Sequence, residues 1–356
     1  MRILHVLNDV EAFGNGIVHV AVDTSCLQAE DGHDVSVASA GGAYVDLLQS
    51  HGVRHYECVA TPRSRTPRAL FELARCVTDF RPEVVHCHMV TSLLISQPAR
   101  LRRPRVRLVS TVHNSFSRSA VLMGLADRVI AVSQAVASDM ASRGIDERKI
   151  DVIANGPLAS PRKIAPPPRQ QRSQSRVIVT TVAGMYERKG ISDLLTAFDM
   201  VSGRFPEAVL TVVGEGPDRS RFQSMADTLS SRDRIKFVGF VADPTPYLSE
   251  ADVFVLASRA DPSPLVIPEA RSASCAVIGT RVDGIPEALD QGEAGLLVEP
   301  SQPAALAASL ERLLSDRRLL AEMQRRAASN LDRFKAERVA RETVSVYEAA
   351  LGGARH

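Results

Sequence analysis

The stretch Asp252-Val-Phe-Val-Leu-Ala-Ser-Arg-Ala-Asp-Pro-Ser-Pro-Leu-Val-Ile-Pro-Glu-Ala270 joins the two local patterns that decide the fold class of this chain. Its first six residues, 252–257, are a short apolar run bounded by turn residues, which predicts a buried parallel strand. Ser263 is a favourable N-cap and Pro264 a favourable first helical residue, so a helix is expected to begin at Pro264. The stretch therefore predicts a strand, a loop and a helix in immediate succession.

The loop of this stretch carries candidate binding residues. Loops after parallel strands face the ligand crevice of an α/β sheet. The expected helix start would leave the amides of Leu265 and Val266 free to bind phosphate. Asp261 precedes the helix and Glu269 lies about one turn inside it, so one carboxylate can reach each end of a phosphate-centred ligand, with a sugar at one side and a ribose at the other. As an isolated pair they would instead be a loop acid and a helix-dipole partner.

The strand-then-helix order recurs along the whole chain. Further strands are expected at 2–8, 34–39, 83–88, 107–113, 128–132, 149–153, 176–183, 209–213 and 235–241. Such alternation predicts parallel sheets with crossover helices. Residues 157–175 are rich in Pro, Arg, Gln and Ser and predict an exposed linker. We therefore expect an α/β domain at 1–156, a second at 176–335, and a final helix within 336–356.

Composition limits the function classes. With 356 residues and 45% hydrophobic content, the chain can bury two cores. Its 43 basic against 41 acidic residues give a net charge of +2, too weak a field to imply nucleic acid as the main partner. No apolar run approaches a membrane span and the first residues resemble a strand rather than a signal peptide, which favours the cytoplasm. Five scattered cysteines, in apolar runs, are expected to be reduced core residues: Cys26, Cys58, Cys76, Cys87 and Cys275.

Two other loops could bind phosphate. Gly14-Asn15-Gly16 leads into a helix expected at 18–29, whose start would let backbone amides approach a diphosphate. Lys189 ends the turn Gly184-Met-Tyr-Glu-Arg-Lys189, where its charge could meet the same group, although a cation before a helix is usually only solvated. A single Gly-x-Gly is a weak signal, so both interpretations depend on context.

Histidines and arginines cluster in the first half. His86 and His88 share one strand face, but no third ligand stands at a sensible spacing, so no metal site is predicted. His113 ends a strand and, taken alone, would more often be a satisfied crevice histidine than a catalytic one. Two arginine patches are expected to be solvated faces, with weak membrane contact or an anionic acceptor left open: Arg63, Arg65 and Arg68, and Arg100, Arg102, Arg103, Arg105 and Arg107.

Three motifs of the second half together carry a family resemblance. They are Ser-x-x-Asp-Pro-x-Pro-Leu-x-x-Pro-Glu-Ala from 258, Val-Ile-Gly-Thr-x-Val-Asp-Gly-Ile-Pro-Glu from 277, and Gly-Leu-Leu-Val-Glu-Pro from 295. This order resembles the C-terminal half of the retaining GT-B glycosyltransferases of family 4, whose usual signature is Glu, seven residues, Glu. Asp261 and Glu269 hold those two positions here. Gly-His-Asp-Val at 32–35 and the segments 127–133 and 153–156 extend the resemblance over nearly the whole chain.

The resemblance implies a GT-B fold, in which two Rossmann-like parallel-sheet domains face each other across a cleft and the last helix crosses back to the N-terminal domain. It implies a retaining hexosyltransferase that moves a sugar from a UDP- or GDP-linked donor to a small-molecule, glycan or lipid-linked acceptor. No cofactor is expected, and the chain has no Asp-x-Asp pair to hold a metal on a diphosphate. Two alternatives are a sugar-nucleotide 2-epimerase of the same fold and a binding protein with a decayed site.

The resemblance also assigns site residues. His113 and Asp261 would face the sugar, and Lys189 would act on the leaving diphosphate. Gly184 stands where many relatives have an arginine, so either Arg188 supplies the second cation or phosphate binding is weaker. The expected donor-binding residues are Gly14, Asn15, Gly16, Arg188, Lys189, Val241, Pro264, Leu265, Val266 and Glu269.

Overall fold

The structure is a computed structural model that describes residues 1–58, 67–162 and 176–352. The chain forms two compact units, Met1–Lys163 with Phe334–His356, and Ile164–Arg333. Two arginines of the first patch, Arg63 and Arg65, and residues 163–175 of the expected linker lie outside the described residues.

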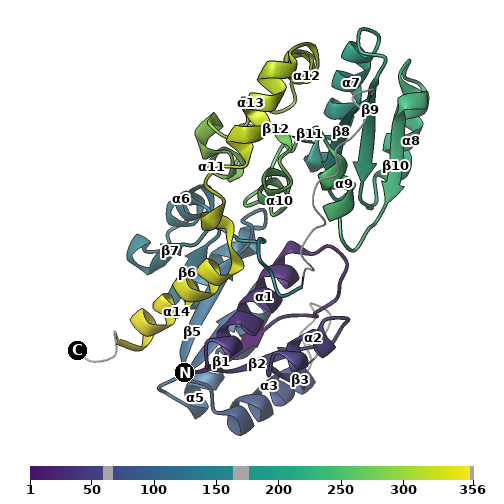
Figure 1. Ribbon diagram of the computed structural model, residues 1–356. Helices are drawn as coiled ribbons and strands as arrows, with labels where there is room; N and C mark the ends of the chain where they lie inside the picture. Colours follow the sequence, from purple (N-terminus) through teal and green to yellow (C-terminus); the bar gives the residue numbers. More distant parts are fainter. Residues whose placement is uncertain (59–66, 163–175, 353–356) are drawn as a thin grey trace. The chain divides into compact units, whose positions relative to one another are not determined.

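The first unit is built on a seven-stranded parallel sheet with the order β3-β2-β1-β4-β5-β6-β7 (Figure 1). Its strands are β1 Arg2–Val6, β2 Asp34–Ser39, β3 Arg54–Glu57, β4 Val84–Cys87, β5 Arg107–Val112, β6 Arg128–Ala131 and β7 Ile150–Val152. Its helices are α1 Gly16–Glu30, α2 Val45–Ser50, α3 Pro67–Phe80, α4 Val90–Ser96, α5 Ala99–Arg102, α6 Gln134–Ser142 and α14 Ala336–Gly352, with a 3-10 segment η1 Arg118–Leu125. The sequence missed β3 because this edge strand has no apolar run.

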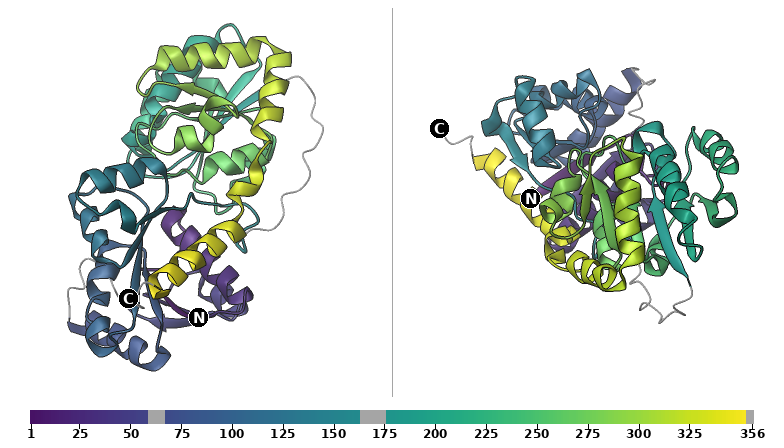
Figure 2. Two further views of the ribbon diagram at one scale, coloured as in Figure 1. Left: turned by 90° about the vertical axis from the view of Figure 1, so that its left-hand side faces the viewer. Right: turned by 90° about the horizontal axis from the view of Figure 1, so that it is seen from above.

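Helices α1 and α14 cover one face of this sheet. Val339, Val346 and Tyr347 of α14 are buried in one core with residues of α1, β1, β4 and β5. The apolar residues of α14 recur at helical spacing, so one stripe of the helix faces the sheet. Figure 2 shows α14, in yellow, lying across the first unit.

The second unit repeats the design with a six-stranded parallel sheet of order β10-β9-β8-β11-β12-β13. Its strands are β8 Val177–Val182, β9 Ala208–Val213, β10 Ile235–Gly239, β11 Val253–Leu256, β12 Ala276–Thr280 and β13 Leu296–Val298. Its helices are α7 Ile191–Ser202, α8 Arg219–Asp227, α9 Thr245–Glu250, α10 Val266–Ser272, α11 Ile285–Ala288, α12 Pro303–Ser315 and α13 Arg317–Ala327, with a 3-10 turn η3 Glu187–Lys189 before α7. The predicted parallel α/β architecture is confirmed in each unit.

Both sheets reverse their strand order at one place, between β1 and β4 and between β8 and β11. At such a switch point the two adjoining crossover connections run to opposite faces of the sheet, which opens a crevice beyond the carboxyl ends of the two strands. The loops after β8 and β11 therefore flank the crevice of the second unit. The loops after β1 and β4 do the same in the first unit.

The start of the expected linker is packed rather than exposed. Leu158 pairs with Lys335, and Ser160 is buried. The cause is Asp23, a buried carboxylate on α1, which accepts two hydrogen bonds of 2.8 Å from Arg162 and one of 2.7 Å from Ser160. A buried carboxylate needs such partners, so residues 157–162 are held on the first unit.

Other expectations from composition can be compared with the described residues. All five cysteines are buried and free, which confirms their core role. The arginine patches are partly paired, since Arg68 binds Glu72 at 2.6 Å and Arg100 binds Asp127 at 2.7 Å. Within the described ranges no helix combines the length and the apolar character needed to cross a membrane.

Candidate active site

The central feature of the second unit is an ion pair between two predicted site residues. Lys189 Nζ lies 2.6 Å from Asp261 Oδ2, with side chains only 15% and 9% exposed. Lys189 ends the 3-10 turn after β8, and Asp261 lies in the loop after β11, so the pair sits at the switch point of the sheet. The structure therefore places both residues where an α/β sheet binds its ligand.

A glycine allows the two loops to meet. Gly190 has φ +64°, and a Cβ atom there would lie 1.9 Å from the carbonyl oxygen of Ala257. No side chain fits at that distance, and the left-handed backbone also favours glycine. Gly190 therefore sets the close approach that brings Lys189 to Asp261.

Arg259 holds the same two loops together and was assigned no role from the sequence. Its Nε and Nη2 donate to the two carboxylate oxygens of Asp193 at 3.0 Å each, and its Nη1 donates to Glu187. Its backbone amide also donates to the Arg188 carbonyl at 2.7 Å. A guanidinium fork suits such bidentate pairing, so Arg259 is the clamp of the Lys189 turn. The sequence signal that could have revealed it is an arginine three residues after a buried strand.

The backbone of Asp261 is fixed by the next loop of the sheet. Its amide donates to Asp283 Oδ2 at 2.7 Å, and its carbonyl accepts from the Gly284 amide at 3.2 Å. Ser258 Oγ lies 3.4 Å from Asp261 Oδ2. Asp283 was also missed by sequence reasoning, although it stands in a Val-Asp-Gly turn directly after β12.

The helix after this loop begins later than predicted. Helix α10 starts at Val266, with Leu265 rather than Ser263 at the N-cap position. Pro264 is buried outside the helix rather than at its first position. The reason is that the loop is already fixed through the backbone of Asp261, so the helix starts after it. Glu269 is half-buried on this seven-residue helix, in its first turn.

Tyr186 occupies the space beside Gly184, the position at which the family resemblance implies an arginine. A Cβ atom on Gly184 would lie 2.9 Å from the Tyr186 ring, so a larger residue at 184 requires that ring to move. Arg188 stacks on the same ring, with its Cζ 5.5 Å from the ring centroid. Gly184 therefore leaves room for the Tyr186 ring, and this ring positions the guanidinium of the exposed Arg188.

Three further predicted donor contacts lie in the first unit. Helix α1 begins at Gly16, two residues earlier than expected, because Asn15 caps it through a 3.1 Å bond from the Ile17 amide. Gly14 precedes the cap with φ +67°. Strand β10 of the second unit ends at Gly239, so Val241 lies in the loop beyond it. The ligand roles of these residues stay predictions.

A cluster of histidines lies at the carboxyl end of the first sheet. His5 of β1, His86 of β4 and His88 after β4 are buried, and one ring nitrogen of each lies within 4.8 Å of the others. His5 is the third ring that sequence spacing did not reveal, because it comes from another strand. Desolvation lowers the pKa of His5 to about 4 and, with neighbouring histidines, the pKa values of His86 and His88 well below 6.5. His113, at the end of β5, contacts His88 at 3.1 Å.

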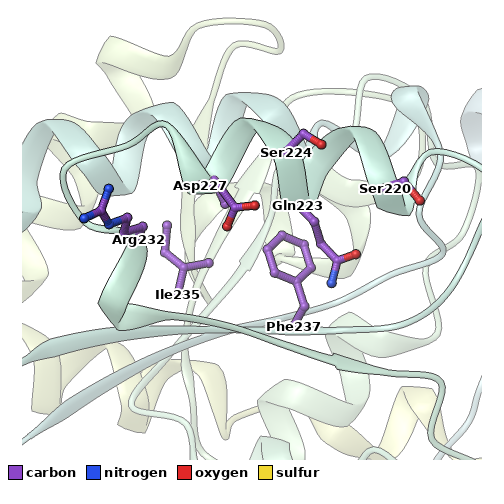
Figure 3. Close-up of a pocket in the computed structure, with 8 residues that line it drawn as sticks. Ser220, Gln223, Ser224, Asp227, Arg232, Ile235 and Phe237 are labelled. Carbon is purple, nitrogen blue, oxygen red and sulfur yellow. The ribbon is translucent and has the colours of Figure 1, made fainter.

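An open pocket at the sheet edge is separate from these residues. It lies between α8 and β10, where Figure 3 shows Gln223 and Asp227 of the helix near Phe237 and Ile235 of the strand. No predicted site residue lines it. We therefore assign the site to the switch point rather than to this pocket.

Two family models match the chain. Residues 14–157 match Glycosyltransferase Family 4, and residues 166–330 match Glycosyl transferases group 1. The chain is 28% identical over 176 residues to N-acetyl-alpha-D-glucosaminyl L-malate synthase of Bacillus anthracis, covering 49% of this chain and 46% of that protein. It thus spans about half the length of that curated relative. It is also 26% identical to the phosphatidyl-myo-inositol mannosyltransferase of Mycolicibacterium smegmatis, over 90% of this chain and 86% of that one.

Solved structures share the architecture. Anabaena Alr3699/HepE in complex with UDP superimposes with a TM-score of 0.82 at 21% identity, covering 98% of this chain and all of that one (100%). WaaG, a glycosyltransferase involved in lipopolysaccharide biosynthesis, gives 0.77 at 14% identity, over 97% and 99%. Together the two family models cover nearly all of the chain from residue 14 to residue 330. This chain belongs to the GT-B glycosyltransferases of family 4.

Proposed function

We propose that this protein transfers a sugar from a nucleoside diphosphate sugar to an acceptor hydroxyl, with retention at the anomeric carbon. The observation that carries the proposal is the Lys189–Asp261 ion pair at the β8/β11 switch point. A cation and an anion held together there match a ligand that has a charged diphosphate next to a sugar. Family membership supplies the reaction class.

The ion pair would exchange partners when the donor binds. Lys189 would turn to the diphosphate and Asp261 to the sugar hydroxyls. Negative charge grows on the diphosphate as the glycosidic bond breaks, so a positioned cation acts most strongly in the transition state. Arg188 is exposed on the same turn and would serve as the second cation. We also propose that His113 contacts the sugar.

The expected donor is a UDP- or GDP-linked sugar, whereas the acceptor has to be found by screening. Anabaena Alr3699/HepE has been solved in complex with UDP and with UDP-glucose, so UDP-sugars are the first donors to try, followed by GDP-sugars. The relatives include an N-acetyl-alpha-D-glucosaminyl L-malate synthase and a phosphatidyl-myo-inositol mannosyltransferase, so a broad acceptor panel is needed. We also propose that no divalent metal is required, because Lys189 and Arg188 lie on one turn.

The proposal is tested in two steps. UDP or GDP, but not the monophosphate, should raise the melting temperature, since a ligand that binds the folded state stabilises it by mass action. A UDP- or GDP-sugar should then be consumed only when an acceptor from the panel is present. Conversion of the donor to its 2-epimer without an acceptor would contradict transfer. So would donor binding with no turnover across the panel, which would indicate a binding protein.

A further inference from the structure

Seven side chains of the first unit form one continuous chain of hydrogen bonds. Its successive links are His113 Nε2 to His88 Nδ1 at 3.1 Å, His88 Nε2 to His5 Nδ1 at 3.0 Å, His5 Nε2 to Gln28 Oε1 at 2.9 Å, Gln28 Nε2 to Tyr347 Oη at 3.5 Å, Tyr347 Oη to His86 Nδ1 at 2.6 Å, and His86 Nε2 to Thr111 Oγ1 at 2.7 Å. These side chains come from β1, β4, β5, α1 and α14 or from the residues that directly follow these strands.

This series of hydrogen bonds runs from the interior of the first unit to its surface. Six of its members are buried, and His5, Gln28 and Tyr347 are 0% exposed. His113 is the partly exposed end. Within the part of the chain that the structure describes, its Nδ1 makes no hydrogen bond to a protein atom.

The direction of every bond follows from the orientation of the Gln28 amide, whose oxygen faces His5 and whose nitrogen faces Tyr347. An amide oxygen can only accept, so His5 Nε2 must carry the proton that bonds to Gln28 Oε1. A neutral imidazole has one proton, so His5 Nδ1 accepts from His88 Nε2. By the same step, His88 Nδ1 accepts from His113 Nε2. The proton of His113 is then on Nε2, and its Nδ1 carries a lone pair.

The bonds on the other side of Gln28 have the same donor-to-acceptor direction along the series. Its Nε2 donates to the Tyr347 hydroxyl, which donates to His86 Nδ1, so the proton of His86 is on Nε2 and bonds to Thr111. All six bonds therefore have a donor and an acceptor with every ring neutral. Desolvation favours the neutral form, since it lowers the pKa values of His5 and His113 to about 4 and about 3.

We propose that Gln28, His5 and His88 are positioning residues that keep the proton of His113 on Nε2, so that its Nδ1 accepts a hydrogen bond from a hydroxyl of the donor sugar. This rests on the proposed function for the identity of the ligand, but not for the proton positions. If the donor and the acceptor of every bond in this series were exchanged, His113 Nδ1 would become a donor, and a sugar hydroxyl would have to accept instead.

The same rings do not fit a metal site as well. His5 Nδ1 and His88 Nε2 face each other across a single proton, and both nitrogens of His86 are bonded. A divalent ion would have to break these bonds in a cluster whose members carry no negative charge. A fully satisfied polar network in a low-dielectric interior is the more stable arrangement.

The proton positions can be measured without any substrate. In ¹⁵N-histidine NMR of the whole protein, we expect His5, His86, His88 and His113 each to show a protonated Nε2 and an unprotonated Nδ1. Gln28→Met removes the acceptor that His5 Nε2 has among the described residues, so His5, His88 and His113 should all gain Nδ1 protonation. Tyr347→Phe breaks only the branch to His86 and should leave His113 unchanged.

Several outcomes would overturn the proposal. One is a wild-type His113 protonated on Nδ1, and another is a Gln28→Met spectrum in which His113 is unaltered. A third is loss of the His5 and His88 Nε2 protons on adding one equivalent of Zn²⁺, which would make the cluster a metal site.

Kinetics test the role in sugar binding separately. We expect Gln28→Met to lower kcat/KM for the sugar donor about tenfold, the worth of one neutral hydrogen bond, with unchanged affinity for the bare nucleoside diphosphate. Ser25→Ala is the matched control, because Ser25 is buried on the same helix and its hydroxyl donates to the Ala21 carbonyl of that helix. Equal kcat/KM for both variants would overturn the sugar contact. Absence of turnover in wild type would instead count against the proposed function and leave the NMR result standing.

Discussion

Lys189 Nζ is 2.6 Å from Asp261 Oδ2, although 72 residues separate them in the sequence. They meet because β8 and β11 are neighbours in the sheet and because Gly190 and Arg259 draw the two following loops together. The pair lies in a mostly buried place, where the two opposite charges face each other. A ligand that replaces the pair must therefore offer both an anion and hydrogen-bond donors, as a sugar diphosphate does.

Lys189→Ala should lower both turnover and stability. Loss of one group that stabilises growing charge typically reduces kcat about a hundredfold. It also leaves Asp261 buried without its cation, which costs about 3 kcal/mol in the free energy of unfolding. Steady-state kinetics and urea unfolding measure the two effects.

The double variant Lys189→Ala/Asp261→Ala separates the effect on turnover from the effect on stability. Removing both charges should restore much of the lost stability but none of the turnover. Simple addition of the two single-variant stability losses would show that the residues are not coupled.

Gly190→Ala should move the Lys189 turn. A Cβ atom 1.9 Å from the Ala257 carbonyl oxygen cannot be accommodated unless the loops separate. We expect a lower melting temperature and weaker binding of nucleoside diphosphate. The control is Gly203→Ala, where a Cβ atom meets nothing within 4 Å and φ is −64°. Equal behaviour of the two variants would show that the close approach is not needed.

Arg259→Lys should loosen the same turn while keeping the charge. A lysine cannot bond to both oxygens of Asp193 and to Glu187 together, so we expect a loss of about 2 kcal/mol in unfolding free energy and a higher donor KM. Arg232→Lys is the control, because Arg232 is 64% exposed and its ion pair with Asp233 is long, at 3.9 Å. If the two substitutions shift melting temperature and KM alike, Arg259 is not a clamp.

The first unit should lose stability on mild acidification. The pKa of His5 is about 4 in the folded protein and 6.5 ordinarily, so between these values the unfolded chain binds more protons. Stability then falls as the pH falls from 6.5 toward 4, by about 1.4 kcal/mol per pH unit for each such histidine. Hydrogen exchange of β1 and β4 at pH 7.5 and 5.5, corrected for intrinsic rates, measures the change.

The second unit is the internal control for this effect. No histidine occurs between His113 and His356 in the sequence. Strands β8 and β9 should therefore lose less protection over the same pH interval. Equal losses in both units would rule out the histidine cluster as the cause.

Metal removal tests another part of the account. Initial rates after exhaustive chelation should equal those before it, because Lys189 and Arg188 are proposed to neutralise the diphosphate. A rate that vanishes and returns in full with magnesium or manganese would contradict this and direct attention to an ion at the diphosphate.

Much of the fold could be predicted from local patterns. The run 252–257 and its equivalents predicted buried parallel strands because each is short, apolar and bounded by turn residues. Strand β3 escaped because its four residues, Arg54–Glu57, are half-buried at best. The start of α10 was placed too early because cap preferences describe an isolated helix, whereas hydrogen bonds to Asp261 fix the preceding loop here.

The site was only partly predictable, for a different reason. Lys189 and Asp261 stood out in their own loops, but their pairing depends on strand order, which no local pattern contains. Arg259 and His5 act through partners 66 and 83 residues away in sequence, Asp193 and His88. Such residues become visible only when the sheet brings their strands together.

The most direct test of the central claim is ¹H NMR of the whole protein mixed with a UDP- or GDP-sugar and the acceptor panel. The account predicts a new anomeric signal with the configuration of the donor, which appears with wild type and is absent with Lys189→Ala/Asp261→Ala. An inverted anomeric signal, or a product that forms equally fast with the double variant, would contradict it.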